Sequence, residues 1–115
     1  MRALLGGLAA GVVLALGGPA FAADPAQVQH GRQVFQYWCS ACHAGGPGHP
    51  GTDALAVKYK DGSRPILLEQ RTDLAPAQVR YYVRHGVSIM PFFRKTEISD
   101  PDLDALGAYL ARERR

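Results

Sequence analysis

The feature that most constrains this chain is the pentapeptide Cys39-Ser40-Ala41-Cys42-His43, which holds the only two cysteines among the 115 residues. Two cysteines separated by two residues and followed at once by histidine form the pattern for covalent attachment of a c-type haem. Each thiol adds across one vinyl group of the porphyrin, and the histidine can then give the iron an imidazole nitrogen. We therefore expect Cys39 and Cys42 to carry haem c through thioether bonds, with His43 as the proximal iron ligand.

Three other interpretations of the cysteine pair compete with haem attachment. A thiol–disulfide protein would place the pair at the start of a helix within a βαβ pattern. A structural disulfide needs no adjacent histidine. A zinc site usually takes two further Cys or His ligands at short spacing. The motif and its surroundings favour haem attachment over all three.

The N-terminal segment, residues 1–22, is typical of a secretory signal peptide. Arg2 supplies a positive start, residues 3–18 are almost wholly small or apolar, and residues 20–22 read Ala-Phe-Ala, a small-x-small cleavage site. We expect cleavage to leave a single domain of residues 23–115 in the periplasm. An uncleaved N-terminal anchor is the alternative, and it is the one arrangement in which a membrane would be a partner.

The charge of the mature chain is nearly balanced. Without Arg2, twelve basic residues oppose ten acidic ones, a formal charge of +2, and two haem propionates would bring it near zero. This is not the balance of a nucleic-acid-binding protein. A chain of this length buries only a modest core, and a large apolar porphyrin would add to it.

Apolar residues at spacings of three and four predict helices at both ends of the domain. The first helix begins at Asp24-Pro25, and the last begins near Ser99 or Asp100. We expect Gly31 to allow close approach of another backbone. The apolar stripe of the first helix is Val28, Gly31, Val34, Phe35 and Trp38. The buried face of the last is Leu103, Leu106, Gly107, Tyr109 and Leu110.

The middle of the domain is predicted to be helical in part. Residues 76–85 form a helix that Gly86 ends, and residues 53–60 are compatible with a short helix. Residues 44–52 are rich in glycine and proline and should form a loop with no helix or strand. Residues 64–72 suggest one or two helical turns at most. Because no β-hairpin signal occurs, we predict an all-α domain.

The proximal loop and two arginines are predicted to contact the haem or its histidine ligand. The loop can place a carbonyl, that of Pro47 or that of Pro50, near the free ring nitrogen of His43. Arg64 and Arg71 flank an apolar run and are candidates to meet the propionates, although a solvated arginine is the commoner outcome.

The sixth iron ligand is predicted to be Met90. After signal removal it is the only methionine, and it lies between two predicted helices beside Pro91. Most methionines simply fill gaps in a core, and His85 is a rival ligand that the sequence leaves open. His30, on the first helix, and His49, in the proximal loop, fit less well. Ligation by histidine and methionine closes both axial positions, raises the reduction potential and restricts the iron to carrying single electrons.

Taken together, these residues resemble a small class I c-type cytochrome. The resemblance covers nearly all of residues 25–112. It implies three to five helices around one haem, with the first and last helices crossing, and axial ligation by His43 and Met90. Ala44 departs from the many members that have glycine after the histidine. The residues that carry the resemblance are Gly31, Phe35, the attachment motif, the Gly/Pro loop, Met90-Pro91, Leu106, Tyr109 and Leu110.

A weaker resemblance concerns the run from Val83-Arg84-His85-Gly86 through Met90-Pro91-Phe92-Phe93 to the last predicted helix. It is similar to the cytochrome subunits of flavocytochromes of the 4-cresol methylhydroxylase type. This similarity implies a flavoprotein partner, a dehydrogenase or hydroxylase that oxidises a para-alkylphenol and passes on single electrons. Phe92 and Phe93 are equally compatible with a docking patch and with ordinary core.

The leading hypothesis is therefore a periplasmic monohaem electron carrier, either free or fixed as a subunit, and not an enzyme. The alternative is a haem enzyme or gas-binding protein with an open or labile sixth site. No carboxylate or arginine pairs plausibly with a distal histidine, which such an enzyme would need. The mature chain has only Lys58, Lys60 and Lys95 as lysines, which slightly favours a dedicated partner over a carrier steered by a lysine ring.

Overall fold

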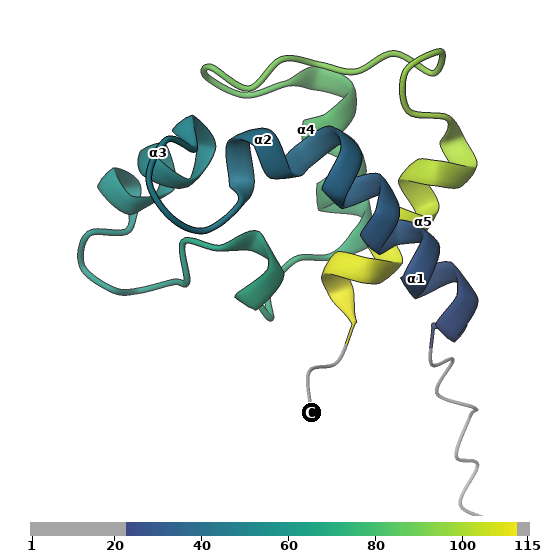
Figure 1. Ribbon diagram of the computed structural model, residues 1–115, viewed down its shortest axis with the longest axis horizontal. Coiled ribbons are helices and arrows are strands. Elements are labelled where there is room, and N and C mark those ends of the chain that lie inside the picture. Colours follow the sequence, from purple (N-terminus) through teal and green to yellow (C-terminus); the bar gives the residue numbers. More distant parts are fainter. Residues whose placement is uncertain (1–22, 113–115) are drawn as a thin grey trace, which may run out of the picture.

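The computed structural model describes residues 23–112 (Figure 1), so the predicted signal peptide lies outside the described residues. No strand occurs between residues 23 and 112, where only an isolated bridge joins Val87 and Met90. The prediction of an all-α domain is confirmed. The helices are α1 (Pro25–Val34), α2 (Ser40–His43), α3 (Pro50–Lys58), α4 (Pro76–His85) and α5 (Asp100–Ala111), with a π-helical segment η1 (Phe35–Cys39) and a 3-10 turn η2 (Leu68–Gln70).

Helix α1 begins where its capping residue predicts. The Asp24 side chain accepts a hydrogen bond from the Ala26 amide at 3.0 Å, and Pro25 occupies the first helical position, where its missing N–H is not needed. The helix passes through η1 into α2 without leaving helical backbone angles. The attachment motif therefore lies at the C-terminal end of one continuous helical rod formed by α1, η1 and α2.

Helix α5 crosses α1, as the class I resemblance implied (Figure 1). Ser99 caps its first turn by accepting from the Asp102 amide at 3.2 Å. At the crossing the ring centroids of Phe35 and Tyr109 lie 6.0 Å apart. The apolar core around this crossing consists of Val34, Phe35, Leu74, Val79, Val83, Ile98, Leu103, Leu106, Tyr109 and Leu110.

Helix α4 packs on α5 with the predicted bounds, and Gly86 ends it at a φ of 72°. Its outer face is tied to the start of α5 by arginines. Arg84 donates to Asp100 at 2.8 Å, and Arg80 donates both to Asp100 and to Asp104. These bonds hold the segment between the two helices, which carries Met90, at both of its ends.

The proximal loop is shorter than predicted. Helix α3 begins at Pro50, within the stretch expected to be a loop, and ends at Lys58. Pro50 takes the first helical position after the extended residue His49, a place that proline tolerates well. Gly51 and Thr52 therefore belong to the first turn of α3, beside the attachment motif.

No helix among residues 23–112 combines the length and the apolar character that crossing a membrane requires.

Candidate haem site

A cavity of about 250 Å³ brings together three of the four residues predicted to hold a haem. Cys39 lines it from η1, His43 from α2 and Met90 from the loop that follows α4. Cys42, the fourth, lies on α2 with its side chain exposed. Residues from distant parts of the sequence thus meet around one space.

The walls of this cavity are mainly apolar. Such a lining, with a few polar groups at one end, suits a flat hydrophobic ligand that carries charged substituents. The apolar wall is formed by Phe35, Leu55, Leu68, Leu74, Val79, Val83, Val87, Leu106 and Leu110. The polar end consists of Lys58, Arg64 and Arg71 around the Tyr59 ring, and Gln78 of α4 is a further polar residue of the lining.

The ring of His43 is in contact with the backbone of α3. A Cβ atom added to Gly51 would stand 2.7 Å from Cε1 of His43, so the imidazole ring packs directly on the first turn of α3. Its Nδ1 is buried and has no hydrogen-bond partner among residues 23–112. The predicted hydrogen bond from this nitrogen to the carbonyl of Pro47 or Pro50 is therefore not present in this structure, in which α3 begins at Pro50 and brings Gly51 against the ring.

Burial also sets the protonation of the site. It lowers the pKa of His43, which favours the neutral imidazole that metals bind. Burial, with a smaller contribution from Cys42, raises the pKa of the Cys39 thiol to about 12. A redox-active dithiol needs the opposite shift, so the raised pKa of Cys39 does not favour a thioredoxin-like pair. In the described part of the chain no three His, Cys, Asp or Glu side chains gather as a metal site would require.

Met90 lies on a tightly bonded loop. Its amide donates to the Val87 carbonyl at 2.9 Å, and the Val87 amide donates back to the Met90 carbonyl at 3.1 Å. The Phe93 amide donates to the Val83 carbonyl at 2.7 Å and anchors the loop on α4. Met90 is half-buried against the core, so hydrogen bonds fix its backbone and core packing restricts its side chain.

The three rival histidines make bonds elsewhere. His85 is exposed, donates to the Tyr81 carbonyl at 2.8 Å and stacks on the Tyr81 ring. His30 donates to Asp102 at 2.7 Å across the α1–α5 crossing. His49 donates to the Ala41 carbonyl at 2.9 Å. None of the three lines the cavity among the described residues, whereas Met90 does.

Comparison with known proteins gives the family. Residues 26–110 match the family described as cytochrome C oxidase, cbb3-type, subunit III. The chain is a small class I c-type cytochrome. A cytochrome c6 of Picosynechococcus sp. strain PCC 7002 is 41% identical over 108 residues, covering 86% of this chain and 81% of that protein. A cytochrome c6 of Synechocystis sp. strain PCC 6803 is 32% identical over 100 residues, covering 87% and 74%. No solved structure matches significantly.

Membership of this family confirms several of the predictions. The cytochrome carries covalently bound haem c, and it is a monohaem electron carrier rather than an enzyme. The residues of the cavity fit a haem by their own chemistry. The imidazole of His43, the thioether of Met90 and the thiol of Cys39 line one mainly apolar space. A redox partner protein follows from this function.

The polar end of the cavity contains an ion-pair group that the sequence only partly indicated. Arg71, predicted as a propionate contact or a solvated residue, is buried at 4% exposure. It donates to both carboxylate oxygens of Asp73, at 2.8 and 2.7 Å, and Arg64 approaches the same carboxylate at 3.0 Å. The bonds from Arg71 lower the pKa of Asp73 to about 2. Both guanidinium groups lie within 6 Å of the Tyr59 ring centre.

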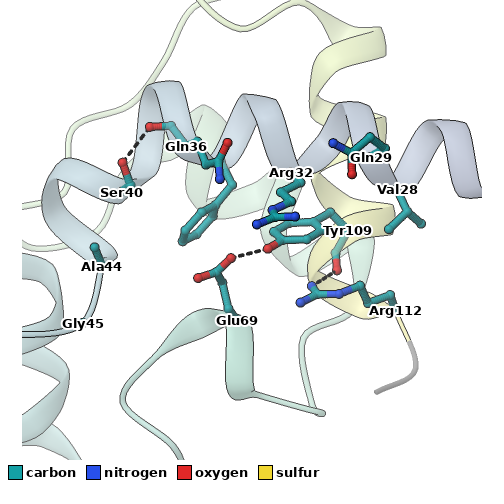
Figure 2. A pocket seen from close by; sticks show the side chains of 11 residues that line it. Val28, Gln29, Arg32, Gln36, Ser40, Ala44, Gly45, Glu69, Tyr109 and Arg112 are labelled. Atoms are coloured by element: carbon teal, nitrogen blue, oxygen red, sulfur yellow. Dashed lines mark hydrogen bonds between the residues drawn. The ribbon is translucent and has the colours of Figure 1, made fainter. Parts of the chain in front are cut away.

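A second, larger cavity of about 560 Å³ lies between α1 and the end of α5 (Figure 2). It is lined mainly by polar side chains and contains none of the predicted iron ligands. Within it the Tyr109 hydroxyl donates to Glu69, and the Arg112 guanidinium lies 3.9 Å from the centre of the Tyr109 ring. Phe35 lines both cavities.

Proposed function

We propose that this cytochrome is a periplasmic carrier of single electrons whose haem iron is ligated by His43 and Met90. One observation carries the proposal: these two residues, far apart in sequence, line the same apolar cavity as Cys39. Haem c bound there would supply reversible one-electron redox chemistry.

Each residue of the site has a distinct part in this proposal. Cys39 and Cys42 tether the porphyrin, and His43 offers a neutral imidazole because burial lowers its pKa. Met90 offers a soft, neutral thioether, which favours the reduced iron. Arg71 and Arg64 offer guanidinium donors to the propionate carboxylates at the polar end. The apolar walls would surround the porphyrin and limit the access of water and other small ligands to it.

Substitution of the two candidate distal ligands tests the assignment. We expect Met90→Ala to abolish the weak sulfur-to-iron band at the red end of the oxidised spectrum and to lower the reduction potential. His85→Ala, which alters an exposed side chain, should change neither. The opposite pattern would make His85 the ligand and would overturn the proposal. Carbon monoxide binding to the reduced proteins adds a second readout, since only loss of the true distal ligand should open the iron to it.

A docking surface for the redox partner is proposed beside the Met90 loop. Three large apolar side chains that do not line the haem cavity, one on α4 and two on this loop, are exposed, and exposed apolar groups beside a functional site suit contact with a partner protein. Phe92 belongs to them with 61% exposure, whereas Phe93 packs its ring 5.9 Å from Trp38. The surface consists of Tyr81, Ile89 and Phe92.

The identity of the partner stays a prediction. The run from Val83 through Phe93 to the last helix resembles flavocytochrome subunits. Together with the apolar docking surface, this resemblance supports a dedicated flavoprotein that oxidises a para-alkylphenol. The names of the two cytochrome c6 relatives mention no flavoprotein. Purification from the native host tests it: a flavin-containing protein that accompanies the cytochrome, and reduces it when given a para-alkylphenol, would support this partner. A cytochrome that purifies alone and accepts no electrons from such a protein would contradict it.

Export to the periplasm is tested by the mass of the native protein. We expect a chain that begins at Ala23 and carries one haem bound through two thioether bonds. A chain that retains Met1 would contradict cleavage and would support the anchored alternative.

A further inference from the structure

The second cavity, of about 560 Å³, is lined along one side by polar residues of the helical rod. These residues recur every three or four positions, which places them along one side of the rod. Such a polar stripe usually faces open solvent, whereas this one faces a hollow with charged side chains on its far wall (Figure 2). The stripe consists of Gln29, Arg32, Gln36 and Ser40.

The far wall of this cavity is formed by η2 and the end of α5. Glu69 comes from η2, Tyr109 from α5, and Arg112 is the C-cap residue of α5. Tyr109 is only 5% exposed, and its hydroxyl donates to the Glu69 carboxylate. The Arg112 guanidinium lies 3.9 Å from the centre of the Tyr109 ring and donates to the Tyr109 carbonyl. These contacts hold the side chains of the wall in place.

Two arginines, one from each wall, approach the same buried phenol. Burial and the hydrogen bond with Glu69 raise the pKa of Tyr109, and the positive charges of Arg112 and Arg32 act against this rise. Figure 2 shows both arginine side chains beside the Tyr109 ring. Among the described residues of the lining, two guanidinium groups face the single carboxylate of Glu69, a formal charge of +1.

The cavity offers mainly hydrogen-bond donors to a ligand. Its guanidinium groups, its two primary amides and its serine hydroxyl all carry N–H or O–H groups. The Glu69 carboxylate already accepts from Tyr109. Guanidinium groups bind the oxygen atoms of carboxylates and phosphates through paired, charge-assisted hydrogen bonds. The volume lies within the range of small-molecule sites, and the polar lining selects a polar ligand.

We propose that this cavity binds a small organic oxyanion, a carboxylate or a phosphate ester, between Arg32 and Arg112. The two guanidinium groups take the charged group, and the amides and the hydroxyl of the stripe bond to the other oxygen atoms of the ligand. A ligand held in this way contacts both α1 and the end of α5, so it stabilises the folded protein. The predicted iron ligands, all among the described residues, do not line this cavity. The inference is therefore independent of the axial ligation.

Titration of the haem-loaded protein tests the site. The probes are succinate, glycerol 3-phosphate and, at matched ionic strength, sodium chloride, and the readout is the backbone amide chemical shifts. We expect succinate, glycerol 3-phosphate or both to shift the amides of residues 28–36 and 109–112 along a saturable curve and to raise the thermal midpoint of unfolding. Saturation by succinate alone identifies a carboxylate ligand, and saturation by glycerol 3-phosphate alone identifies a phosphate ester. Shifts that stay linear, or that chloride reproduces, would overturn the proposal.

Two arginine variants separate the site from a general effect of charge. Arg32→Gln removes one guanidinium group from an exposed position. We expect it to weaken binding about tenfold or more, as loss of a charge-assisted hydrogen bond does, with an unchanged haem spectrum. Arg94→Gln is the matched control, because Arg94 is 70% exposed and does not line the cavity. It should bind like the wild type. Equal loss of affinity in both variants, or wild-type affinity in Arg32→Gln, would contradict the site.

Discussion

Gly31 of α1 and Ala105 of α5 meet backbone to backbone. A Cβ atom at residue 31 would overlap the carbonyl oxygen of Ala105 and would stand 2.7 Å from Cβ of Tyr109. One turn further along the same rod, Phe35 is 2% exposed and packs on Tyr109 while it lines the haem cavity. The separation of the two helices at the crossing therefore sets the position of one wall of the cavity.

Gly31→Ala should destabilise the cytochrome. Forcing a methyl group into a backbone contact costs about 1–3 kcal/mol or more, of which alanine's higher helix propensity offsets about 1 kcal/mol. Denaturant unfolding of the haem-loaded protein measures the loss. Gly45→Ala is the matched control, because a Cβ atom there would meet Leu67 at an ordinary distance of 3.6 Å. Equal free energies of unfolding for the two variants would contradict the close approach.

The elements that could be predicted from the sequence are those with local signals. Asp24 and Ser99 cap α1 and α5 in the structure as their side chains suggest, and Gly86 ends α4. Gly31 was expected to admit another backbone, and α5 supplies it. The attachment motif and Met90 could be singled out because the required residue types are so few in this chain.

The remaining features depend on contacts between distant residues, which leave little trace in a single sequence. The start of α3 at Pro50 is hidden among glycines and prolines that also suit a loop. The bonds of His49 and Thr52 to the attachment motif exist only once α3 has docked. The sequence does not show that Arg71 is buried, because its burial depends on the hydrogen bonds that it donates to Asp73 in the folded protein.

Asp73 should make the cytochrome lose stability in acid. Its pKa is about 2 in the folded protein, below the ordinary value of 3.8, because Arg71 donates to it. A lowered pKa contributes stability that is present above about pH 4 and is lost as the pH falls towards 2. Since the carboxylate is 38% exposed, solvent screening reduces this contribution to roughly 1 kcal/mol.

Asp73→Asn tests this contribution. We expect the variant to be less stable at neutral pH by about 1–2 kcal/mol, because the buried Arg71 loses its anionic partner. The fall in unfolding free energy between pH 4 and pH 2 should also become shallower than in the wild type. An unchanged slope over that interval would mean that other carboxylates, such as Asp100, control the acid response.

Phe92 and Phe93 should respond oppositely to truncation. Phe92→Ser changes a side chain of the docking surface, so we expect a stability change within about 0.5 kcal/mol and slower electron transfer with the native partner. Phe93→Ala removes a ring that packs on Trp38 and should lower the unfolding free energy by about 2 kcal/mol. Stopped-flow electron transfer and denaturant unfolding on both variants measure the two effects. If electron transfer slowed in Phe93→Ala but not in Phe92→Ser, the proposed docking surface would be contradicted.

Gly86→Ala should loosen the proposed bond between Met90 and the iron. Gly86 has a φ of 72°, and a Cβ atom there would stand 2.7 Å from the Met90 carbonyl oxygen and 3.0 Å from the Phe92 amide nitrogen. The variant therefore combines backbone strain of about 1–3 kcal/mol with displacement of the loop that carries Met90. We expect the sulfur-to-iron band to disappear at a lower temperature than in the wild type, well before the helices unfold.

Gly62→Ala separates strain from displacement. Gly62 has a similar φ of 73°, but a Cβ atom there meets nothing within 4 Å among the described residues. It should cost about 1 kcal/mol of stability and leave the thermal midpoint of the band unchanged relative to global unfolding. If the thermal midpoint of the band fell together with that of global unfolding in both variants, loss of the band would reflect unfolding of the whole domain. A selective effect of Gly86→Ala would instead tie the band to the Met90 loop, because only that substitution pushes on the loop's backbone.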